Sequence, residues 1–143
     1  MPIQSPHILM CPPDHYGIHY EINPWMSTRR QADHELAVQQ WQGLYACLEN
    51  AGAKISLLDP VEGLPDLVFT ANAAIIYRPQ AVLARFKHEQ RQGEEPHFQC
   101  WLEDHGWHVQ QAPGDFAFEG AGDALFCGET LYAGYRMRSD ALG

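Results

Sequence analysis

The sequence predicts an α/β fold in which similar strand and helix units repeat around a common axis, as in a propeller. Short apolar runs of strand length alternate with two segments of helical periodicity. Residues 48–52, at the end of the first helical segment, resemble residues 102–106, at the end of the second. Residues 66–76 likewise resemble residues 115–126, so the period is roughly fifty residues, with about two and a half ββαβ-type units. Because an incomplete ring leaves a strand edge unpaired, we expect residues 1–143 to form a single domain within a longer chain.

The composition argues against nucleic acid or membrane as a partner. Nine lysines and arginines stand against eighteen aspartates and glutamates, which gives a formal net charge of −9 with neutral histidines. An acidic surface repels phosphate groups, whereas a cationic small molecule suits it better. No apolar run approaches the roughly 20 residues of a membrane helix, and the first residues do not form a secretory leader.

The cysteines indicate a reducing compartment. They are widely spaced, lack a CxxC pair and lie inside apolar runs, so we expect reduced, mostly buried thiols and a cytoplasmic protein. The four are Cys11, Cys47, Cys100 and Cys127.

The first third of the chain predicts a strand, a long loop, a helix and a second strand. Residues 7–11 form an apolar run that two prolines end, and residues 14–26 lack any period. Asp33 is a candidate N-cap for a helix that ends near Gly52, and residues 54–58 are predicted as a strand. The apolar face of this helix is expected to comprise Leu36, Trp41, Leu44, Tyr45 and Leu48.

The middle of the chain predicts mainly extended structure. Residues 66–72 follow a turn and match the strand-like part of the repeat. Residues 73–77 and 81–86 are predicted to pair as a hairpin, and residues 87–95 form a charged loop.

The last third predicts a second helix and further strands. The helix is expected to begin at Pro96 and to end at Gly106, and residues 107–111 are predicted as a strand. Near the end of the chain, Ser139 or Asp140 has the character of an N-cap with almost no helix after it.

The stretch of residues 118–135 contains an acidic turn between two apolar runs. Glu119 and Asp123 flank a segment with glycines at 120 and 122, which allow the backbone to approach a ligand closely. A carboxylate facing a cavity there would need a cationic partner. An ordinary acidic β-turn explains the same residues.

Four segments, in this order, resemble the guanidine-modifying superfamily, which includes arginine deiminase, dimethylarginine dimethylaminohydrolase and the amidinotransferases. They are CPPDHYGIHYEINPWM, PDLVFTAN, ARFKHEQRQGEE and FEGAGDALF, and the similarity spans essentially the whole chain. Together they are most similar to the arginine dihydrolases, which convert arginine to ornithine with release of two ammonia molecules and carbon dioxide. The resemblance implies a pentein-like five-fold α/β propeller with the substrate on its axis, of which this chain is the N-terminal part.

The resemblance also implies roles for individual residues. Glu119 matches the carboxylate that holds the guanidinium, for which bidentate pairing gives a physical reason. Asn72 matches a position where deiminases commonly have Asp; the dihydrolases have Asn there. Asn23 matches a second active-site Asn, and Arg91 matches the residue expected to clamp the substrate α-carboxylate. The residues themselves also allow other roles. Asn23 can be a turn or cap residue, and Arg91 can be one charge on a solvated loop.

Two further acidic residues each allow two interpretations. We expect Asp66 either to contact the substrate or to be part of a turn that opens a strand after Pro65. We expect Asp123 either to support the site or to satisfy the backbone of the turn. His15 and His19 stand four residues apart, but the prolines and glycine around them argue against the helix that would align them on a metal. No metal and no cofactor are expected.

The superfamily reaction also needs a Cys nucleophile and a His that transfers protons, and the family places both later in the chain. Cys127 is nearest to the acidic turn, but it has no neighbouring cation and its thiol is expected to be inert. The prediction is therefore the binding part of a guanidino-group hydrolase. The alternatives are a non-catalytic assembly module that pairs with a copy of itself through its open edge, and an amidinotransferase.

Overall fold

The computed structural model describes residues 5–77 and 79–141 and divides into two compact units, Met1–Thr70 and Ala71–Gly143. The order of strands and helices confirms the α/β class that the sequence predicts. Each unit contains strands that come together from distant parts of its sequence. Arg78, which lies in the predicted hairpin turn, is outside the described residues.

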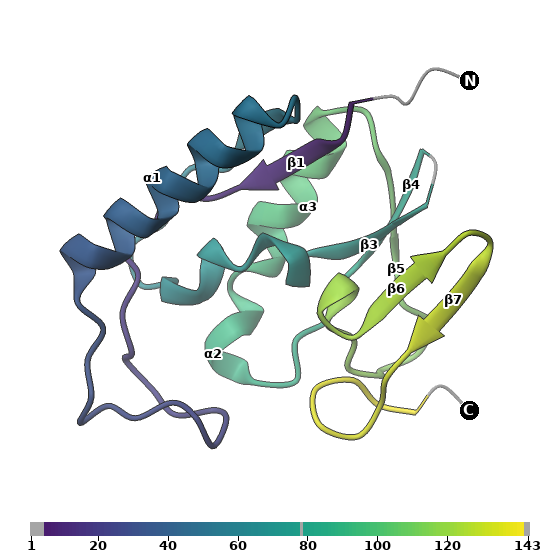
Figure 1. Cartoon of the computed structure of the whole chain (residues 1–143). Helices are drawn as coiled ribbons and strands as arrows, with labels where there is room; N and C mark the ends of the chain where they lie inside the picture. Colours follow the sequence, from purple (N-terminus) through teal and green to yellow (C-terminus); the bar gives the residue numbers. More distant parts are fainter. Residues whose placement is uncertain (1–4, 78, 142–143) are drawn as a thin grey trace. The chain divides into compact units, whose positions relative to one another are not determined.

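The first unit is a strand, helix and strand arrangement. Strand β1 (His7–Met10) pairs in parallel with β2 (Lys54–Leu57), and helix α1 (His34–Asn50) connects them. Figure 1 shows α1 lying alongside β1. After β2, the short 3-10 helix η1 (Pro65–Val68) leads to Thr70, whose hydroxyl donates to the carbonyl of Leu9 at 2.7 Å. This bond ties the end of the unit back to its first strand.

Helix α1 begins as predicted but buries a different set of side chains. The Asp33 side chain accepts a hydrogen bond from the Leu36 backbone N–H, which satisfies one of the free donors of the first turn. No residue of α1 is fully buried, and both Leu36 and Leu44 are exposed, so their predicted place on the apolar face is wrong. The half-buried residues at a spacing of three and four are Val38, Trp41, Tyr45 and Leu48.

The second unit contains a three-stranded sheet and a separate hairpin. Strand β4 (Gln80–Leu83) lies between β3 (Ala74–Tyr77), its antiparallel partner, and β5 (His108–Gln111), its parallel partner. Helices α2 (Glu89–Gln92) and α3 (Glu95–Asp104) form the connection from β4 to β5 (Figure 1). A parallel pair needs such a crossover, because a tight turn cannot reverse the chain twice.

The hairpin follows the acidic turn. The turn is the 3-10 helix η3 (Gly120–Gly122), and the two strands are β6 (Ala124–Cys127) and β7 (Thr130–Ala133). Just before the turn, Phe118 and Arg85 form an antiparallel bridge that joins this segment to the end of β4.

The core of the second unit lies under the three-stranded sheet and helix α3. Its most deeply buried apolar side chains, at 1% exposure or less, come from β4, from the segment that follows β4, from α3 and from the first residue of the strand at 124–127. They are Ala81, Leu83, Ala84, Phe86, Phe98 and Ala124.

Two other predictions need correction. Residues 66–72 form the 3-10 helices η1 and η2 (Thr70–Asn72) instead of a strand. The charged segment 87–95 is not a solvated loop, because it contains α2 and the start of α3 and it buries Arg91. The element that Ser139 or Asp140 is expected to cap would continue past Ala141, outside the described residues.

The cysteine prediction is only partly right. Cys11 is buried, but the other three side chains are exposed, because each lies on the outer face of its helix or strand. They are Cys47 on α1, Cys100 on α3 and Cys127 on β6.

Truncation of Phe98 to Ala is expected to destabilise the second unit strongly. The ring is fully buried on α3, so its loss leaves a cavity as well as removing buried apolar area. We expect a loss of about 3–5 kcal/mol in the free energy of unfolding. Cys100→Ala, on the exposed face of the same helix, should change it by less than about 0.5 kcal/mol. Urea unfolding followed by circular dichroism measures both, and equal effects of the two changes contradict this assignment of the core.

Candidate active site

The predicted site residues are divided between the two units. Four belong to the second unit, where the structure brings them together around one buried carboxylate: Asn72, Arg91, Glu119 and Asp123. Asn23 and Asp66 belong to the first unit and are described separately below.

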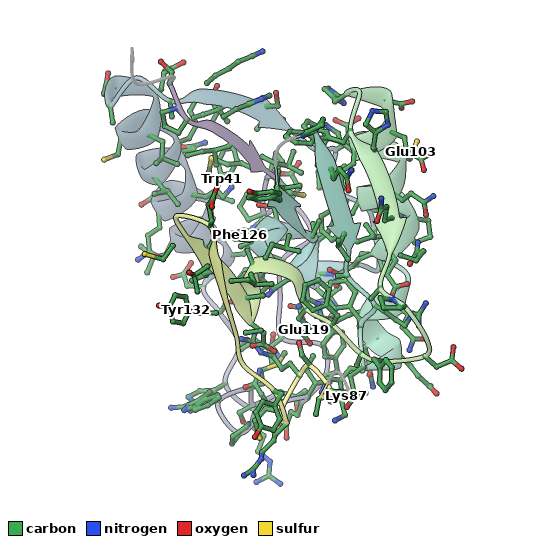
Figure 2. The ribbon with its side chains drawn as sticks, turned by 90° about the vertical axis from the view of Figure 1, so that its right-hand side faces the viewer. Trp41, Lys87, Glu103, Glu119, Phe126 and Tyr132 are labelled. Atoms are coloured by element: carbon green, nitrogen blue, oxygen red, sulfur yellow. The ribbon has the colours of Figure 1, made fainter. Side chains whose placement is uncertain are left out.

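Glu119 is placed by the glycines that follow it. Its side chain is 2% exposed, and in Figure 2 it lies among the side chains of the second unit, whereas Glu103 lies on the outside of α3. Gly120 has a φ of 52°, and a Cβ there would meet the backbone nitrogen of Ala74 at 2.7 Å. A larger residue at position 120 is therefore excluded by both conformation and space.

Gly122 makes room for Asn72. A Cβ on Gly122 would collide with the side-chain nitrogen of Asn72. The absent side chain at 122 thus lets the buried amide of Asn72 approach the acidic turn. The two glycines of the turn thus serve close packing within the chain, and their predicted role in letting the backbone approach a ligand is not tested.

The Glu119 carboxylate faces two guanidinium groups. Its Oε2 lies 3.4 Å from Nη1 of Arg138 and 4.0 Å from Nη1 of Arg91. Within the described part of the chain, this buried oxygen accepts no hydrogen bond. Burial raises the pKa of Glu119 above its ordinary value, and nearby Asp123 adds to this rise; Arg91, Arg138 and His88 oppose it. Oε2 of Glu119 is therefore desolvated and, within the described residues, lacks a direct N–H donor.

Arg91 is held by Glu94, which sequence reasoning did not identify. Nε and Nη2 of Arg91 donate to the two carboxylate oxygens of Glu94 at 2.9 and 2.7 Å, and both side chains are buried. Nη1 donates to Oδ1 of Asn72 at 3.2 Å. The guanidinium also lies over the ring of Phe86. Arg91 therefore fixes the orientation of the Asn72 amide, because the side-chain oxygen of Asn72 accepts a hydrogen bond from Nη1 of Arg91.

Arg138 is a second residue that sequence reasoning missed. Its Nη2 donates to Oδ1 of Asp123 at 2.9 Å and to the carbonyl of Gly122 at 3.0 Å. Asp123 in turn accepts from the hydroxyl of Ser139 at 2.8 Å, and that hydroxyl accepts from the backbone N–H of Glu119. Asp123 thus contacts the groups around Glu119, and its supporting role in a substrate site stays a prediction.

Neither missed residue had a strong signal in the sequence. Glu94 stands three residues after Arg91, which predicts a pair only once α2 is recognised as a helix. Arg138 lies outside the four motifs, and only the folding of residues 136–139 back onto the turn brings it to Glu119.

The first-unit candidates have local roles. The side-chain oxygen of Asn23 accepts from the backbone N–H groups of Trp25 and Met26, which is an Asx turn, and the residue is exposed. Asp66 is buried in the first turn of η1, directly after Pro65. The turn interpretation of Asn23 is confirmed, and the substrate-binding roles of Asn23 and Asp66 stay predictions.

Two further features were sought in the described residues, a metal-binding cluster and a membrane-spanning helix. No cluster of three or more His, Cys, Asp or Glu side chains there is arranged to hold a metal ion. The helices in the same ranges are all too short or too polar to cross a membrane.

A buried carboxylate whose Oε2 accepts no hydrogen bond among the described residues suits a cationic ligand with N–H donors. The comparison with known families points to proteins named for such a substrate. The chain belongs to the family described as N,N dimethylarginine dimethylhydrolase, eukaryotic, which matches residues 19–142.

Individual relatives agree with this assignment. The chain is 49% identical over 136 residues to the bifunctional arginine dihydrolase/ornithine cyclodeaminase ArgZ of Synechocystis, covering 93% of this chain and 19% of that protein. It is 37% identical over 131 residues to N(G),N(G)-dimethylarginine dimethylaminohydrolase of Mycobacterium tuberculosis, covering 92% of this chain and 43% of that enzyme.

A solved structure has the same fold. It is the N-terminal domain of an asparagine-to-serine variant of ArgZ, covalently bound to a reaction intermediate. It matches with a TM-score of 0.88 and 47% identity, over 94% of this chain and 50% of that domain. The chain therefore spans about half the length of the catalytic domain that it resembles.

Replacement of Glu119 by Gln is expected to change how stability depends on pH. Because the folded state raises the pKa of Glu119, it binds the proton more tightly than the unfolded chain, and wild-type stability falls as pH rises from about 4.3 through the raised pKa. E119Q lacks this loss. The difference in unfolding free energy, E119Q minus wild type, should therefore increase with pH across this range and be flat below it.

Urea unfolding between pH 4 and pH 8 measures this difference. Glu103→Gln, an exposed carboxylate on α3, is the control and should run parallel to the wild type. A difference for E119Q that decreases as pH rises contradicts the assignment, because it means that the folded state favours the charged carboxylate.

Proposed function

We propose that this chain supplies the substrate-binding part of a cytoplasmic hydrolase that acts on arginine or a related guanidino compound. The observation that carries the proposal is the buried Oε2 of Glu119, which accepts no hydrogen bond within the described residues. A guanidinium offers planar N–H donors and a positive charge, and it would satisfy this oxygen and neutralise the carboxylate. The arginine dihydrolase and dimethylarginine hydrolase relatives support this substrate class.

Asn72 is proposed to assist the reacting centre. Its oxygen is engaged by Arg91, so its NH₂ group is presented as a donor beside Gly122. A neutral amide donor suits an attacking water or a developing oxyanion. Asn23 and Asp66 are proposed to contact the substrate from the first unit.

Arg91 has two proposed roles. The family resemblance assigns it to the substrate α-carboxylate. Its contacts add a role in positioning Asn72, because Nε and Nη2 donate hydrogen bonds to Glu94 and Nη1 donates to the side-chain oxygen of Asn72. A substrate carboxylate would have to share this guanidinium with Glu94.

The covalent steps are proposed to use polypeptide outside residues 1–143. A thiolate adds to the guanidinium carbon to form a C–S bond, and the resulting tetrahedral adduct expels ammonia, which takes its proton from a His. Water then adds to the thiouronium and the C–S bond breaks. The covalently bound intermediate in the ArgZ variant supports this route. An amidinotransferase would instead expel the alkylamine of the substrate in the first step, so that the amidino group stays on the sulfur, and an acceptor amine would then take the place of water.

Binding of arginine tests the role of Glu119. We expect weak binding of L-arginine to the chain and a loss of about ten- to a hundredfold in affinity in E119Q, because a charge-assisted hydrogen bond is lost. Glu103→Gln should bind like the wild type. Isothermal titration calorimetry gives both constants. We expect no turnover, so robust arginine hydrolysis that survives E119Q would contradict the proposal.

Measurement of the products released from arginine by a longer chain identifies the reaction. A chain extended by its downstream coding sequence should release ornithine and two equivalents of ammonia from arginine if it is a dihydrolase. Citrulline with one equivalent indicates a deiminase, and a product that requires added amine indicates a transferase.

A second proposed function is self-association, and the hairpin after the acidic turn favours it. Strand β7 pairs only with β6 among the described strands, and the hairpin exposes Leu125, Leu131 and Tyr132 (Figure 2 labels Tyr132). An unpaired strand edge without charged residues can pair with a second copy of itself.

Leu131→Lys should weaken such an association, because a charge on an edge strand disfavours pairing. Sedimentation velocity should show the wild type shifting to a dimer with rising concentration, and the variant shifting less. Gln42→Lys on the exposed side of α1 adds the same charge elsewhere and should behave as the wild type. A monomer at every concentration excludes this second function.

A further inference from the structure

Two buried carboxylates approach the guanidinium of Arg91 in the second unit. Nε and Nη2 of Arg91 donate hydrogen bonds to Glu94 at 2.9 and 2.7 Å. Nη1 of Arg91 lies 4.0 Å from Oε2 of Glu119, which is beyond the distance of a hydrogen bond. The Glu94 side chain is 0% exposed and that of Glu119 is 2% exposed. Both carboxylates are therefore removed from solvent, but Glu94 has the two close contacts with the guanidinium.

The position of Glu94 explains why it holds Arg91. Glu94 follows Arg91 by three residues, between α2 and α3, so the pair is local in the chain. Its two oxygens match the parallel N–H groups of Nε and Nη2, which is the geometry in which arginine pairs most strongly with a carboxylate. Because a guanidinium is planar and rigid, this pair also sets the direction of Nη1, which donates to Oδ1 of Asn72 at 3.2 Å.

Without the Glu94 carboxylate, Arg91 has another acidic partner close to it. Among the described residues, Glu119 is the other carboxylate within 4.0 Å of the Arg91 guanidinium. A buried guanidinium without a carboxylate is costly, so loss of Glu94 drives Arg91 toward Glu119. A shift of about 1 Å brings Nη1 within hydrogen-bond distance of Oε2. The new bond occupies the oxygen that the proposed function assigns to a substrate guanidinium.

We propose that Glu94 is a positioning residue that keeps Arg91 away from Glu119, so that Oε2 of Glu119 stays available for the guanidinium of a substrate. The inference rests on the proposed function, because that function assigns the same oxygen to the substrate. Arg91 keeps its proposed contact with the substrate α-carboxylate, since Glu94 sets only its distance from Glu119. Glu94 acts through Arg91 and is not itself assigned to the substrate.

Glu94→Gln removes the charge of this residue and nearly keeps its size. One acceptor oxygen becomes an NH₂ donor, which cannot accept a hydrogen bond from Arg91. Arg91 then bonds to Glu119, and a guanidinium ligand must displace it before binding. The measured dissociation constant rises as the fraction of molecules with an open Glu119 falls. For a hydrogen bond between charged groups, this corresponds to a factor of about ten to a hundred.

Methylguanidinium is the appropriate probe, because it has the guanidinium and no carboxylate that Arg91 could bind. Its dissociation constant is measured at pH 8 from the shift of the Gly120 amide signal in NMR spectra. We expect E94Q to bind it about ten- to a hundredfold more weakly than the wild type. Glu95→Gln is the matched control, since it removes the same charge one residue later. The Glu95 side chain accepts from the backbone N–H of Phe86, which a Gln oxygen can also do, so E95Q should bind like the wild type.

Two further readouts report on the position of Arg91 directly. In a crystal structure of E94Q, the distance from Nη1 of Arg91 to Oε2 of Glu119 should fall from 4.0 Å to the hydrogen-bond range of about 2.9 Å. In the wild type, the Nε–H of Arg91 should exchange slowly with water, because it donates to the buried carboxylate of Glu94. Its NMR signal should keep this slow exchange when methylguanidinium is added. A variant that is merely less stable would not move Arg91 onto Glu119.

The outcomes separate this inference from the proposed function. If the wild type and E94Q bind methylguanidinium equally, the inference is wrong and the proposed function stands. If E95Q weakens binding as much as E94Q, or if Arg91 stays 4.0 Å from Glu119 in E94Q, the effect is one of charge alone and the inference is also wrong. If E94Q does not fold, the wild-type Nε–H signal decides, because rapid exchange overturns the inference and slow exchange supports it. If the wild type does not bind the probe, the proposed function fails and the inference fails with it.

Discussion

The burial of the Glu119 carboxylate is the constraint on which the second unit depends. The charge can stay in the interior only because guanidinium groups approach it from two sides. Placing it there requires the glycine at 120, which lets the turn pack on the start of β3, and the bridge of Phe118 to Arg85. Sheet, turn and hairpin are therefore arranged around a single charged group.

The charges around Glu119 do not balance. The described cluster contains the carboxylates of Glu94, Glu119 and Asp123 and the guanidiniums of Arg91 and Arg138, so it has one carboxylate in excess. Burial raises the pKa of Glu119, which means that the excess is costly in this environment. A bound cation removes that cost more completely than Arg138, which is half exposed and shared with Asp123. A cation is therefore favoured over a neutral or anionic group beside this carboxylate.

The sequence predicts the regular elements well and the connections poorly. Periodicity identifies α1, α3 and most strands, because alternation and helical spacing reflect which side is buried. It fails at residues 66–72, where an apolar run forms two 3-10 helices. It also fails for Leu36 and Leu44, since spacing shows that a helix has an apolar stripe but not which residues a neighbour covers. Buried Arg91 and Glu94 were unpredictable for the same reason: a pair that satisfies itself looks in sequence like two surface charges.

The internal repeat explains how the Asn72 and Glu119 segments come to meet. From the 3-10 turn through the hairpin, the two copies have the same bounds shifted by fifty residues: η2 and η3 precede β3 and β6, which pair with β4 and β7. In this register Asn72 corresponds to Gly122, and each is the last residue of its 3-10 turn. The two positions are in contact, and the amide of Asn72 fills the space that a side chain at Gly122 would take. The turn of the first copy therefore contributes the amide of Asn72, and the turn of the second copy has a glycine at the equivalent position. This difference between the two repeats allows the two turns to pack together beside Glu119.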